Sequence, residues 1–439
     1  MAKKATEKTQ AASSDETSSE PGRVHARGAN SQQRVLWAAL FAQGLNGRRG
    51  LPYVLVGERG SAKTSSVRQL AGQANLAFEG VLGSLRSPID FLGVPVPRKR
   101  QLGPLDQHLS PDGEAEFTYM HYAPAGFSMR AALAGRAVIL LDEVNTCPPS
   151  VQAALLRVLF EGVVGELELP PGVRMLLAMN ETKDAAGGWD IAPPLANRMG
   201  WLEWSSPTPQ EFTRFLLNGG RGAHLVKDET GAWVPGESVD PAAEEAAVDS
   251  VWGRAWAVSV GEVSGFLHRR AELLLKRGKE GDRQWPSPRT WELTTRALAG
   301  SYVYDLTPIE REMACAAFVG SGAFGEFFAW RKEADLPDPE ALLDGQATFK
   351  HTPARLDRTA AVLTACTAIV TPENAKSRKE RTARLWHLIR GMTADATDVC
   401  LPSVIALCNA RLMSASEEAY HVLANIEPVM SAAGITKVS

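Results

Sequence analysis

Residues 57–65 have the types and the spacing of a loop that could bind phosphate. The segment reads GERGSAKTS, and its glycines let backbone N–H groups point toward an anion where a helix begins. Lys63 is placed to reach the β- and γ-phosphates of a nucleotide, and the Thr64 hydroxyl is placed to bind Mg²⁺. The strict pattern G-x-x-x-x-G-K-[ST] has glycine where this chain has Ala62. We expect little effect, because alanine tolerates a helical backbone and adds only a methyl group. The nucleotide contacts predicted in this loop are Gly57, Glu58, Arg59, Gly60, Ser61, Ala62, Lys63, Thr64 and Ser65.

Two adjacent carboxylates follow the apolar run 137–141. Asp142 would hold Mg²⁺, largely through water, while Glu143 would orient and polarise the water that attacks the phosphate. Asn180 ends the next apolar run and could bridge the γ-phosphate and that water. An isolated acidic pair is more often a solvated strand end, and a lone Asn is more often a turn residue. Their order behind a phosphate-binding loop favours the catalytic interpretation.

Two arginines could stabilise negative charge that develops on a transferring phosphate. Arg198 lies in the loop PPLANRM, and Arg289 lies at a helix start after Ser287-Pro288. A guanidinium suits this task because it is permanently charged and can donate two parallel hydrogen bonds. For either arginine taken alone, a surface ion pair is the commoner explanation.

Strands and helices alternate from residue 50 to about residue 205, which predicts a parallel sheet with helices on both faces. Ligands of such sheets bind at the carboxyl ends of the strands. Lys63, Asp142, Glu143 and Asn180 all follow predicted strand ends, so we expect them to meet at one edge. The other strand predictions are a hairpin over 102–122 with its turn at 110–113, and a strand pair formed by 166–169 and 173–179.

The chain divides into four predicted parts. Residues 1–31 contain few large apolar side chains and are expected to be a disordered tail. Residues 32–206 form the α/β nucleotide-binding domain, 207–335 an all-α lid with one helix over 310–328, and 336–439 a C-terminal helical extension. The helices predicted in the extension span 355–370, 381–392 and 399–413. The tryptophans are expected to form lid and interdomain core: Trp201, Trp204, Trp252, Trp256 and Trp291.

Composition is that of an ordinary globular protein, with 44% hydrophobic residues, 22% charged residues and a net charge of −3 over 439 residues. The slightly acidic balance gives no general attraction to nucleic acid or anionic membranes. No window approaches the roughly 20 apolar residues of a spanning helix, and the N-terminus has no secretory signal. The five cysteines show no CxxC pair, which predicts buried reduced thiols, no site in which cysteines bind a metal, and a cytoplasmic protein.

The motifs GERGSAKT, ILLDEVN, AMN, PLANRM and SPRTWE, in this order, resemble those of MoxR-type AAA+ ATPases, a helix-2-insert clade of dynein-related AAA type. The resemblance covers roughly residues 33–330. It implies a homo-oligomeric ring, hexameric or of another size, with ATP and Mg²⁺ bound between protomers. Asn180 would be the sensor-1 residue, Arg198 the arginine finger donated to the neighbour's site, and Arg289 the sensor-2 residue contacting the γ-phosphate of its own subunit. The hairpin over 102–122 would be the insert that faces the ring pore.

Two residues depart from the pattern of this family. Ala62 replaces the usual glycine, although some relatives carry alanine there. Thr146 stands where many relatives have arginine, which puts in doubt any contact between subunits from that position.

The resemblance further implies that ATP hydrolysis remodels a protein partner in the manner of a chaperone. Such ATPases often act with a protein that carries a von Willebrand A-type domain. The alternative is a nucleotide-gated switch or scaffold with negligible hydrolysis. A nucleic-acid motor or transcriptional activator is a third hypothesis, disfavoured by the charge; the basic run 97–101 is expected to be a solvated loop.

Overall fold

The computed structural model describes residues 24–28, 30–101, 116–181, 188–217, 225–227, 233–235, 238–276, 278, 282–413 and 417–432. Among these residues, no helix combines the length and apolar character that a membrane crossing requires.

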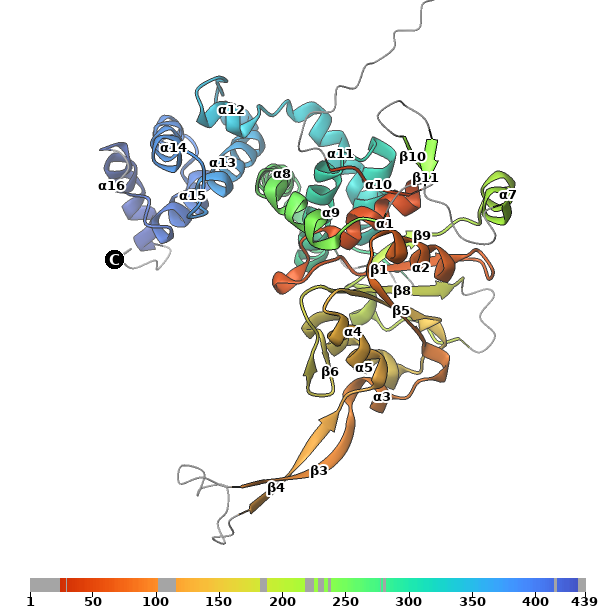
Figure 1. Cartoon of the computed structure of the whole chain (residues 1–439). Coiled ribbons are helices and arrows are strands. Elements are labelled where there is room, and N and C mark those ends of the chain that lie inside the picture. Colours follow the sequence, from red (N-terminus) through yellow and green to blue (C-terminus); the bar gives the residue numbers. More distant parts are fainter. Residues whose placement is uncertain are drawn as a thin grey trace, which may run out of the picture.

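A five-stranded sheet lies at the centre of the N-terminal half (Figure 1), in the order β2-β5-β8-β1-β9. All four strand pairs are parallel. The strands are β1 (Tyr53–Gly57), β2 (Ala77–Leu82), β5 (Ala137–Asp142), β8 (Val173–Asn180) and β9 (Gly200–Glu203). The three central strands are buried almost throughout, as expected when helices cover both faces. The predicted fold class is confirmed.

Alternate residues of the strands pack into two separate cores. Tyr53 and Leu55 face a core shared with helices α1 (Ser31–Phe41) and α2 (Lys63–Gln73) and with the lid helices. Val54 and Val56 face the core on the other side of the sheet. The helices of that second layer are α3 (Pro88–Leu92), α4 (Gly126–Ala134), α5 (Pro149–Glu161) and α6 (Pro193–Ala196).

An antiparallel hairpin projects away from the body of the molecule (Figure 1). It pairs β3 (Val94–Gln101) with β4 (Glu116–Ala123) over their whole length. A hairpin was predicted, but its first strand begins at Val94 rather than after 102, so the basic run 97–101 belongs to a strand and not to a loop. The predicted turn at 110–113 lies outside the described residues.

The predicted pairing of 166–169 with 173–179 is wrong. Short strand β7 (Leu167–Glu168) pairs instead with β6 (Val163–Val164), while β8 lies between β5 and β1. The physical reason is visible in β8 itself: its apolar run is buried on both faces, which suits a central parallel strand and not one arm of a hairpin.

In the described part of 207–335, the lid contains four helices of 12 or more residues, of which α8 is the longest, and a short antiparallel strand pair that the all-α prediction did not include. The predicted helix over 310–328 is two helices, because Gly320 adopts a positive φ of 86° between them. Trp252 and Trp291 are buried in the lid core, in agreement with the prediction. The elements are α7 (Pro209–Leu217), β10 (Leu225–Lys227), β11 (Trp233–Pro235), α8 (Pro241–Arg269), α9 (Pro288–Val303), α10 (Pro308–Val319) and α11 (Ser321–Ala334).

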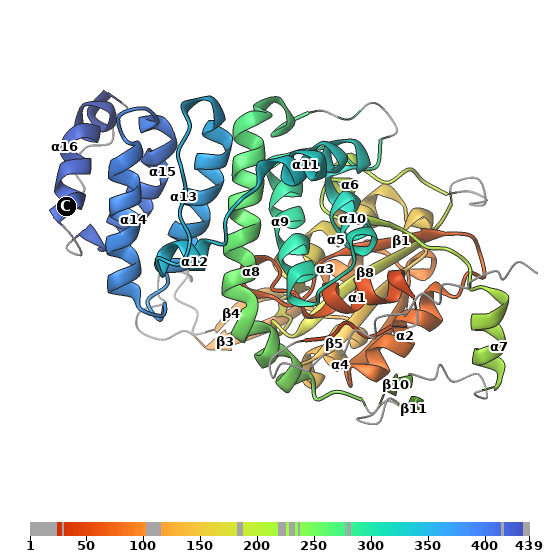
Figure 2. The same cartoon turned by 90° about the horizontal axis from the view of Figure 1, so that it is seen from above.

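The C-terminal extension lies against the lid through α13, which runs beside α8 (Figure 2). Gly265 of α8 makes this approach possible: a Cβ there would lie 2.6 Å from the Asp357 carbonyl oxygen and 2.7 Å from the Ala361 Cβ. The helices are α12 (Pro339–Leu343), α13 (Leu356–Val370), α14 (Arg378–Met392), α15 (Thr397–Asn409) and α16 (Glu417–Ala432). Neither α12 nor α16 was predicted.

The N-terminal segment is packed where the structure describes it. Val24 and Ala26 are buried in the core that contains α1, and the Ala26 carbonyl accepts a hydrogen bond from Arg34. The prediction of disorder is therefore wrong for 24–28, while residues 1–23 lie outside the described residues.

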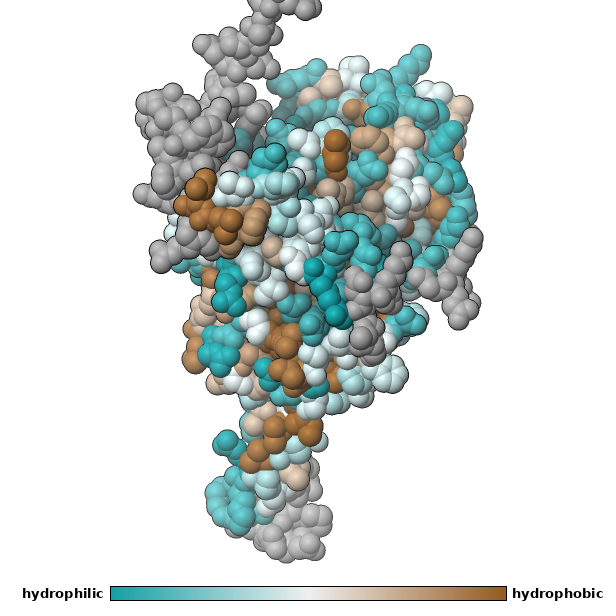
Figure 3. Space-filling model, turned by 90° about the vertical axis from the view of Figure 1, so that its right-hand side faces the viewer, coloured by the Kyte–Doolittle hydropathy of each residue, from teal (hydrophilic) through white to brown (hydrophobic). Residues whose placement is uncertain are grey.

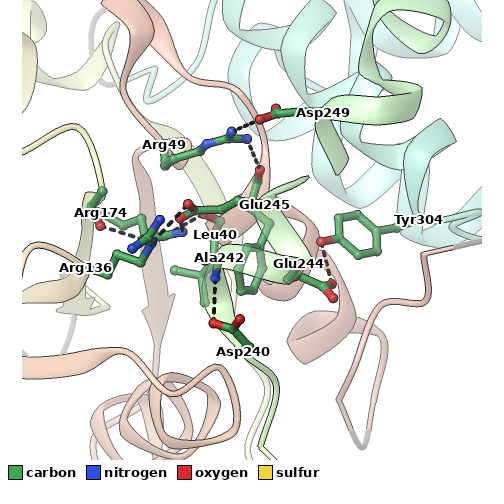
Figure 4. Close-up of polar contacts among 12 residues, drawn as sticks. Leu40, Arg49, Arg136, Arg174, Asp240, Ala242, Glu244, Glu245, Asp249 and Tyr304 are labelled. Carbon is green, nitrogen blue, oxygen red and sulfur yellow. Dashed lines mark hydrogen bonds and ion pairs between the residues drawn. The ribbon is translucent and has the colours of Figure 1, made fainter. Parts of the chain in front are cut away.

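A buried ion-pair cluster joins the sheet to the first turns of α8 (Figure 4). Arg174 of β8 is 1% exposed and donates to the carboxylate of Glu245. Arg136 donates to the other carboxylate oxygen of Glu245, at 3.1 Å. Close by, Arg49 pairs with Asp249, one turn further along α8. These pairs fix the start of the long lid helix to the α/β domain.

Candidate functional site

The strand register brings the predicted residues to one edge of the sheet. Gly57 pairs with Asn180, so the end of β1 and the end of β8 lie level. Asp142 is the last residue of β5, the next strand along. Lys63 begins α2 and belongs to the phosphate loop formed by residues 57–65. Lys63, Asp142 and Asn180 therefore lie at one edge of the sheet, as predicted.

Lys63 occupies the centre of this edge. Its Nζ donates to the carbonyl oxygens of Gly57 and Glu58, at 2.9 and 2.8 Å, and to the Asn180 Oδ1 at 3.2 Å. Burial lowers the pKa of Lys63, and the carboxylate of Asp142 partly opposes that shift. The ammonium group is therefore held by neutral oxygens that phosphate oxygens could replace.

Helix α2 has no side-chain cap, and this leaves its first N–H groups for an anion. The residue before the helix, Ala62, has φ 63° and ψ 23°, in the left-handed region. The expected reason for tolerating alanine here is thus wrong, because the backbone is not right-handed helical at this position. A left-handed alanine costs on the order of 1–2 kcal/mol that glycine would not.

Two oxygen-bearing side chains that could act as ligands of Mg²⁺ lie next to each other. The Thr64 hydroxyl donates to Asp142 Oδ2, while Asp142 Oδ1 accepts from the Glu143 N–H at 2.9 Å. Mg²⁺ prefers hard oxygen ligands and usually keeps several waters, so one hydroxyl and one carboxylate fit it. An ion at this place would take over the contact that now joins Thr64 and Asp142.

Glu143 is held in an unusual conformation beside the metal ligands. Its backbone is left-handed, with φ 57° and ψ 42°, and its carboxylate accepts a hydrogen bond from the Ser84 hydroxyl at 2.9 Å. Sequence reasoning missed Ser84, although it follows the second strand as Asp142 follows its own. It also missed Asn145, a buried residue whose amide donates to the Asn180 carbonyl at 3.2 Å.

Arg198 lies at the opposite edge of the sheet. It precedes β9, whose first residue, Gly200, is level with Tyr53 at the start of β1. At about 3.3 Å per residue, the length of β1 separates Arg198 from the phosphate loop by roughly 15 Å. Its guanidinium lies 4.5 Å from the Phe160 ring centroid, and its Nε is buried with no hydrogen-bond partner among the described residues.

Arg289 lies close enough to Arg198 for the two positive charges to interact. Burial lowers the pKa of Arg198, and the positive charge of Arg289 lowers it further. The Ser287 hydroxyl donates to the Asn197 Oδ1 at 2.9 Å, which anchors the start of α9 at this edge. In the part of the chain that the structure describes, neither arginine hydrogen-bonds to the phosphate loop. The predicted residues therefore form two groups on opposite edges.

A parallel sheet whose carboxyl edge carries a phosphate loop, two strand-end acids and an asparagine defines an α/β domain of the AAA+ class. Residues 52–199 match the family model described as AAA domain (dynein-related subfamily), roughly a third of the chain. The matched segment contains the phosphate loop, Asp142, Glu143, Asn180 and Arg198. Over this segment the chain is thus similar to AAA domains of the dynein-related subfamily.

Among solved structures, the chain is similar to one described as "a putative ATPase from Cytophaga hutchinsonii". The two share 15% sequence identity, the match covers 66% of this chain and 79% of that one, and the TM-score is 0.39. No curated protein matches the chain.

Proposed function

We propose that this protein binds ATP with Mg²⁺ and hydrolyses it as a MoxR-type AAA+ ATPase, at a site completed by a second copy. The division of the predicted residues between two edges of one sheet carries the proposal. Lys63 and Asn180 converge at the carboxyl edge, whereas Arg198 lies at the amino edge, out of reach of its own phosphate loop. A neighbour packed head to tail can supply that arginine, and repetition of such an interface closes a ring, hexameric by resemblance.

Each residue at the carboxyl edge has a task that its position allows. Lys63 would exchange its carbonyl contacts for the β- and γ-phosphates of ATP. Thr64 and Asp142 would hold Mg²⁺, which neutralises charge on the phosphates. Glu143 would orient the attacking water, and Asn180, which already contacts Lys63, would bridge that water and the γ-phosphate.

In this proposal both arginines act in the neighbour's site. Arg198 is half-buried, and the hydrogen bond from its Nη1 to the Pro194 carbonyl, at 3.4 Å, is long and exposed, so an incoming phosphate could replace it. Arg289 lies beside Arg198, and this position favours action in trans over the same-subunit contact that the resemblance implies. Two guanidinium groups aimed at one γ-phosphate would stabilise the charge that builds during transfer.

The work done by hydrolysis is proposed to be the remodelling or assembly of a protein partner. Figure 3 shows apolar residues gathered where the projecting hairpin joins the body. The exposed large apolar side chains there include Val94, Val96, Met120 and Tyr122. Exposed apolar patches of this kind commonly mark surfaces that bind other proteins. By resemblance, a protein with a von Willebrand A-type domain is the proposed partner, and the five buried, unpaired thiols fit a cytoplasmic location.

One feature favours the alternative, a nucleotide-gated switch with negligible hydrolysis. The carboxylate of Glu143 is already engaged by Ser84, so it is held by the protein before any water arrives. A protein that keeps this contact when ATP is bound would bind nucleotide and assemble without turnover.

Glu143→Gln separates these functions. The ATPase proposal expects the variant to bind ATP and remain assembled while phosphate release falls at least about 100-fold, the size of effect that loss of a catalytic base produces. The matched control is Glu161→Gln, which neutralises an exposed carboxylate of α5 that pairs with Arg157. Turnover by the variant at the wild-type rate would rule out Glu143 as the base. ATP binding without turnover in the wild type, with or without partner proteins, would favour the switch.

A further inference from the structure

Trp204 contacts the phosphate loop at its start and at its middle. It follows β9, and its indole Nε1 donates to the carbonyl oxygen of Ser61 at 3.1 Å; both residues are buried. Its own N–H donates to the Val56 carbonyl at 2.6 Å. Its carbonyl oxygen lies 2.2 Å from where a Cβ on Gly57 would be, so only glycine fits there. The phosphate loop therefore packs closely against Trp204 and is hydrogen-bonded to it.

The indole contact fixes the orientation of the peptide unit between Ser61 and Ala62. In a trans peptide the C=O and the N–H point in opposite directions. Because the Ser61 carbonyl is turned toward Trp204, the N–H of Ala62 is turned away from it, to the side where α2 begins without a cap. That N–H donates to no backbone acceptor among the described residues and can bind an anion instead.

The same peptide unit precedes the strained residue of the loop. Ala62 has φ 63°, a conformation that glycine adopts freely and alanine does not. A loop with alanine at this position therefore needs an external contact to stay in the conformation that exposes its N–H groups. The buried hydrogen bond from Trp204 is such a contact.

We infer that Trp204 is a positioning residue for nucleotide binding: its indole N–H holds the phosphate loop in the anion-binding conformation that Ala62 disfavours. This inference rests on the proposed nucleotide-binding function and adds a residue that the family motifs do not include. Sequence reasoning placed Trp204 in the interdomain core, and its burial agrees with that, but packing does not require the N–H.

Trp204→Phe tests the role because phenylalanine keeps a buried aromatic ring and removes the donor. The measurement is the Kd of MgADP by isothermal titration calorimetry, on the full chain. Loss of one hydrogen bond to a buried carbonyl predicts roughly 3- to 10-fold weaker binding. When Ala62→Gly is also present, the left-handed conformation is no longer strained, and the same Trp204→Phe change should weaken binding less than about 2-fold.

The matched control is Trp201→Phe. Trp201 lies on β9, three residues before Trp204, and is as buried as Trp204. Its indole donates to the Ala196 carbonyl at 3.1 Å, away from the phosphate loop. The Trp201→Phe change should leave the Kd of MgADP unchanged. The Trp201→Phe and Trp204→Phe variants should have similar melting temperatures. A merely structural role for Trp204 would move the melting temperature without this dependence on residue 62.

The outcomes are distinct. Binding of MgADP by Trp204→Phe as tight as by the wild type, or an equal loss with and without Ala62→Gly, overturns the inference alone. Failure of the wild type to bind MgADP overturns the nucleotide-binding proposal and the inference with it.

Discussion

Glu245→Gln is expected to destabilise the protein by about 3 kcal/mol, because it leaves a buried guanidinium without its counter-ion. Arg174 is 1% exposed, and burial lowers its pKa, a shift that the carboxylate of Glu245 opposes. Glutamine keeps the shape of the side chain and one acceptor but removes the charge. Removing one partner of a buried pair typically costs about 3–5 kcal/mol. The lower end applies here, because Arg174 keeps bonds to the carbonyls of Leu40 and Gly172.

The assay is urea unfolding followed by tryptophan fluorescence, with the midpoint and slope compared between variants. Glu244→Gln is the matched control: this neighbouring carboxylate accepts hydrogen bonds from Trp37 and Tyr304, which are neutral donors. Its loss of charge should cost less than about 1 kcal/mol. The double variant Arg174→Met with Glu245→Leu should recover much of the lost stability, since an apolar pair can replace a buried ion pair. A Glu245→Gln protein as stable as the Glu244→Gln control would refute this reasoning.

Two further predictions concern the packing of α8 against α13 and the pKa of Lys63. Gly265→Ala should lower the urea midpoint, because the added Cβ would lie 2.6 Å from the Asp357 carbonyl oxygen, whereas Gly253→Ala on the same helix meets nothing within 4 Å and should raise it slightly. Equal effects of the two changes would argue against close packing of α8 on α13. For the lysine, bound phosphate favours the charged form, while burial lowers the pKa of Lys63. MgADP affinity should therefore fall as pH rises through that lowered pKa, below the ordinary lysine value. Lys63→Arg should remove the dependence of MgADP affinity on pH over pH 7–10. A wild-type MgADP affinity that stays constant over this range would contradict the prediction.

The carboxyl-edge group could be predicted from the sequence because each member follows an apolar run. Such runs become buried parallel strands, and parallel strands end at a common edge. This rule and the motif spacing are enough to predict that Lys63, Asp142 and Asn180 lie together, and the structure places them together. The separation of Arg198 from them also follows from position in the chain, since it precedes a strand instead of following one.

The remaining features depend on contacts that local patterns do not encode. The bond from Ser84 to Glu143 joins residues 59 positions apart, and the bond from Trp204 to Ser61 spans 143. The left-handed backbone of Ala62 contradicts the ordinary preference of alanine, so propensity predicted the wrong conformation. The start of the hairpin at Val94 was missed because two prolines and a basic run obscure the strand, which is exposed along its length and has no buried face to mark it.

The central claim is that the catalytic site is shared between two copies, and mixing two inactive variants tests it most directly. Glu143→Gln removes the base from its own site, and Arg198→Ala removes the arginine that the neighbour requires. Each protein alone should release little phosphate. In an equimolar mixture, random assembly of a head-to-tail ring should restore about one quarter of the interfaces, and turnover should rise accordingly. No gain of turnover in mixed oligomers, or full activity of Arg198→Ala alone, would contradict a shared site.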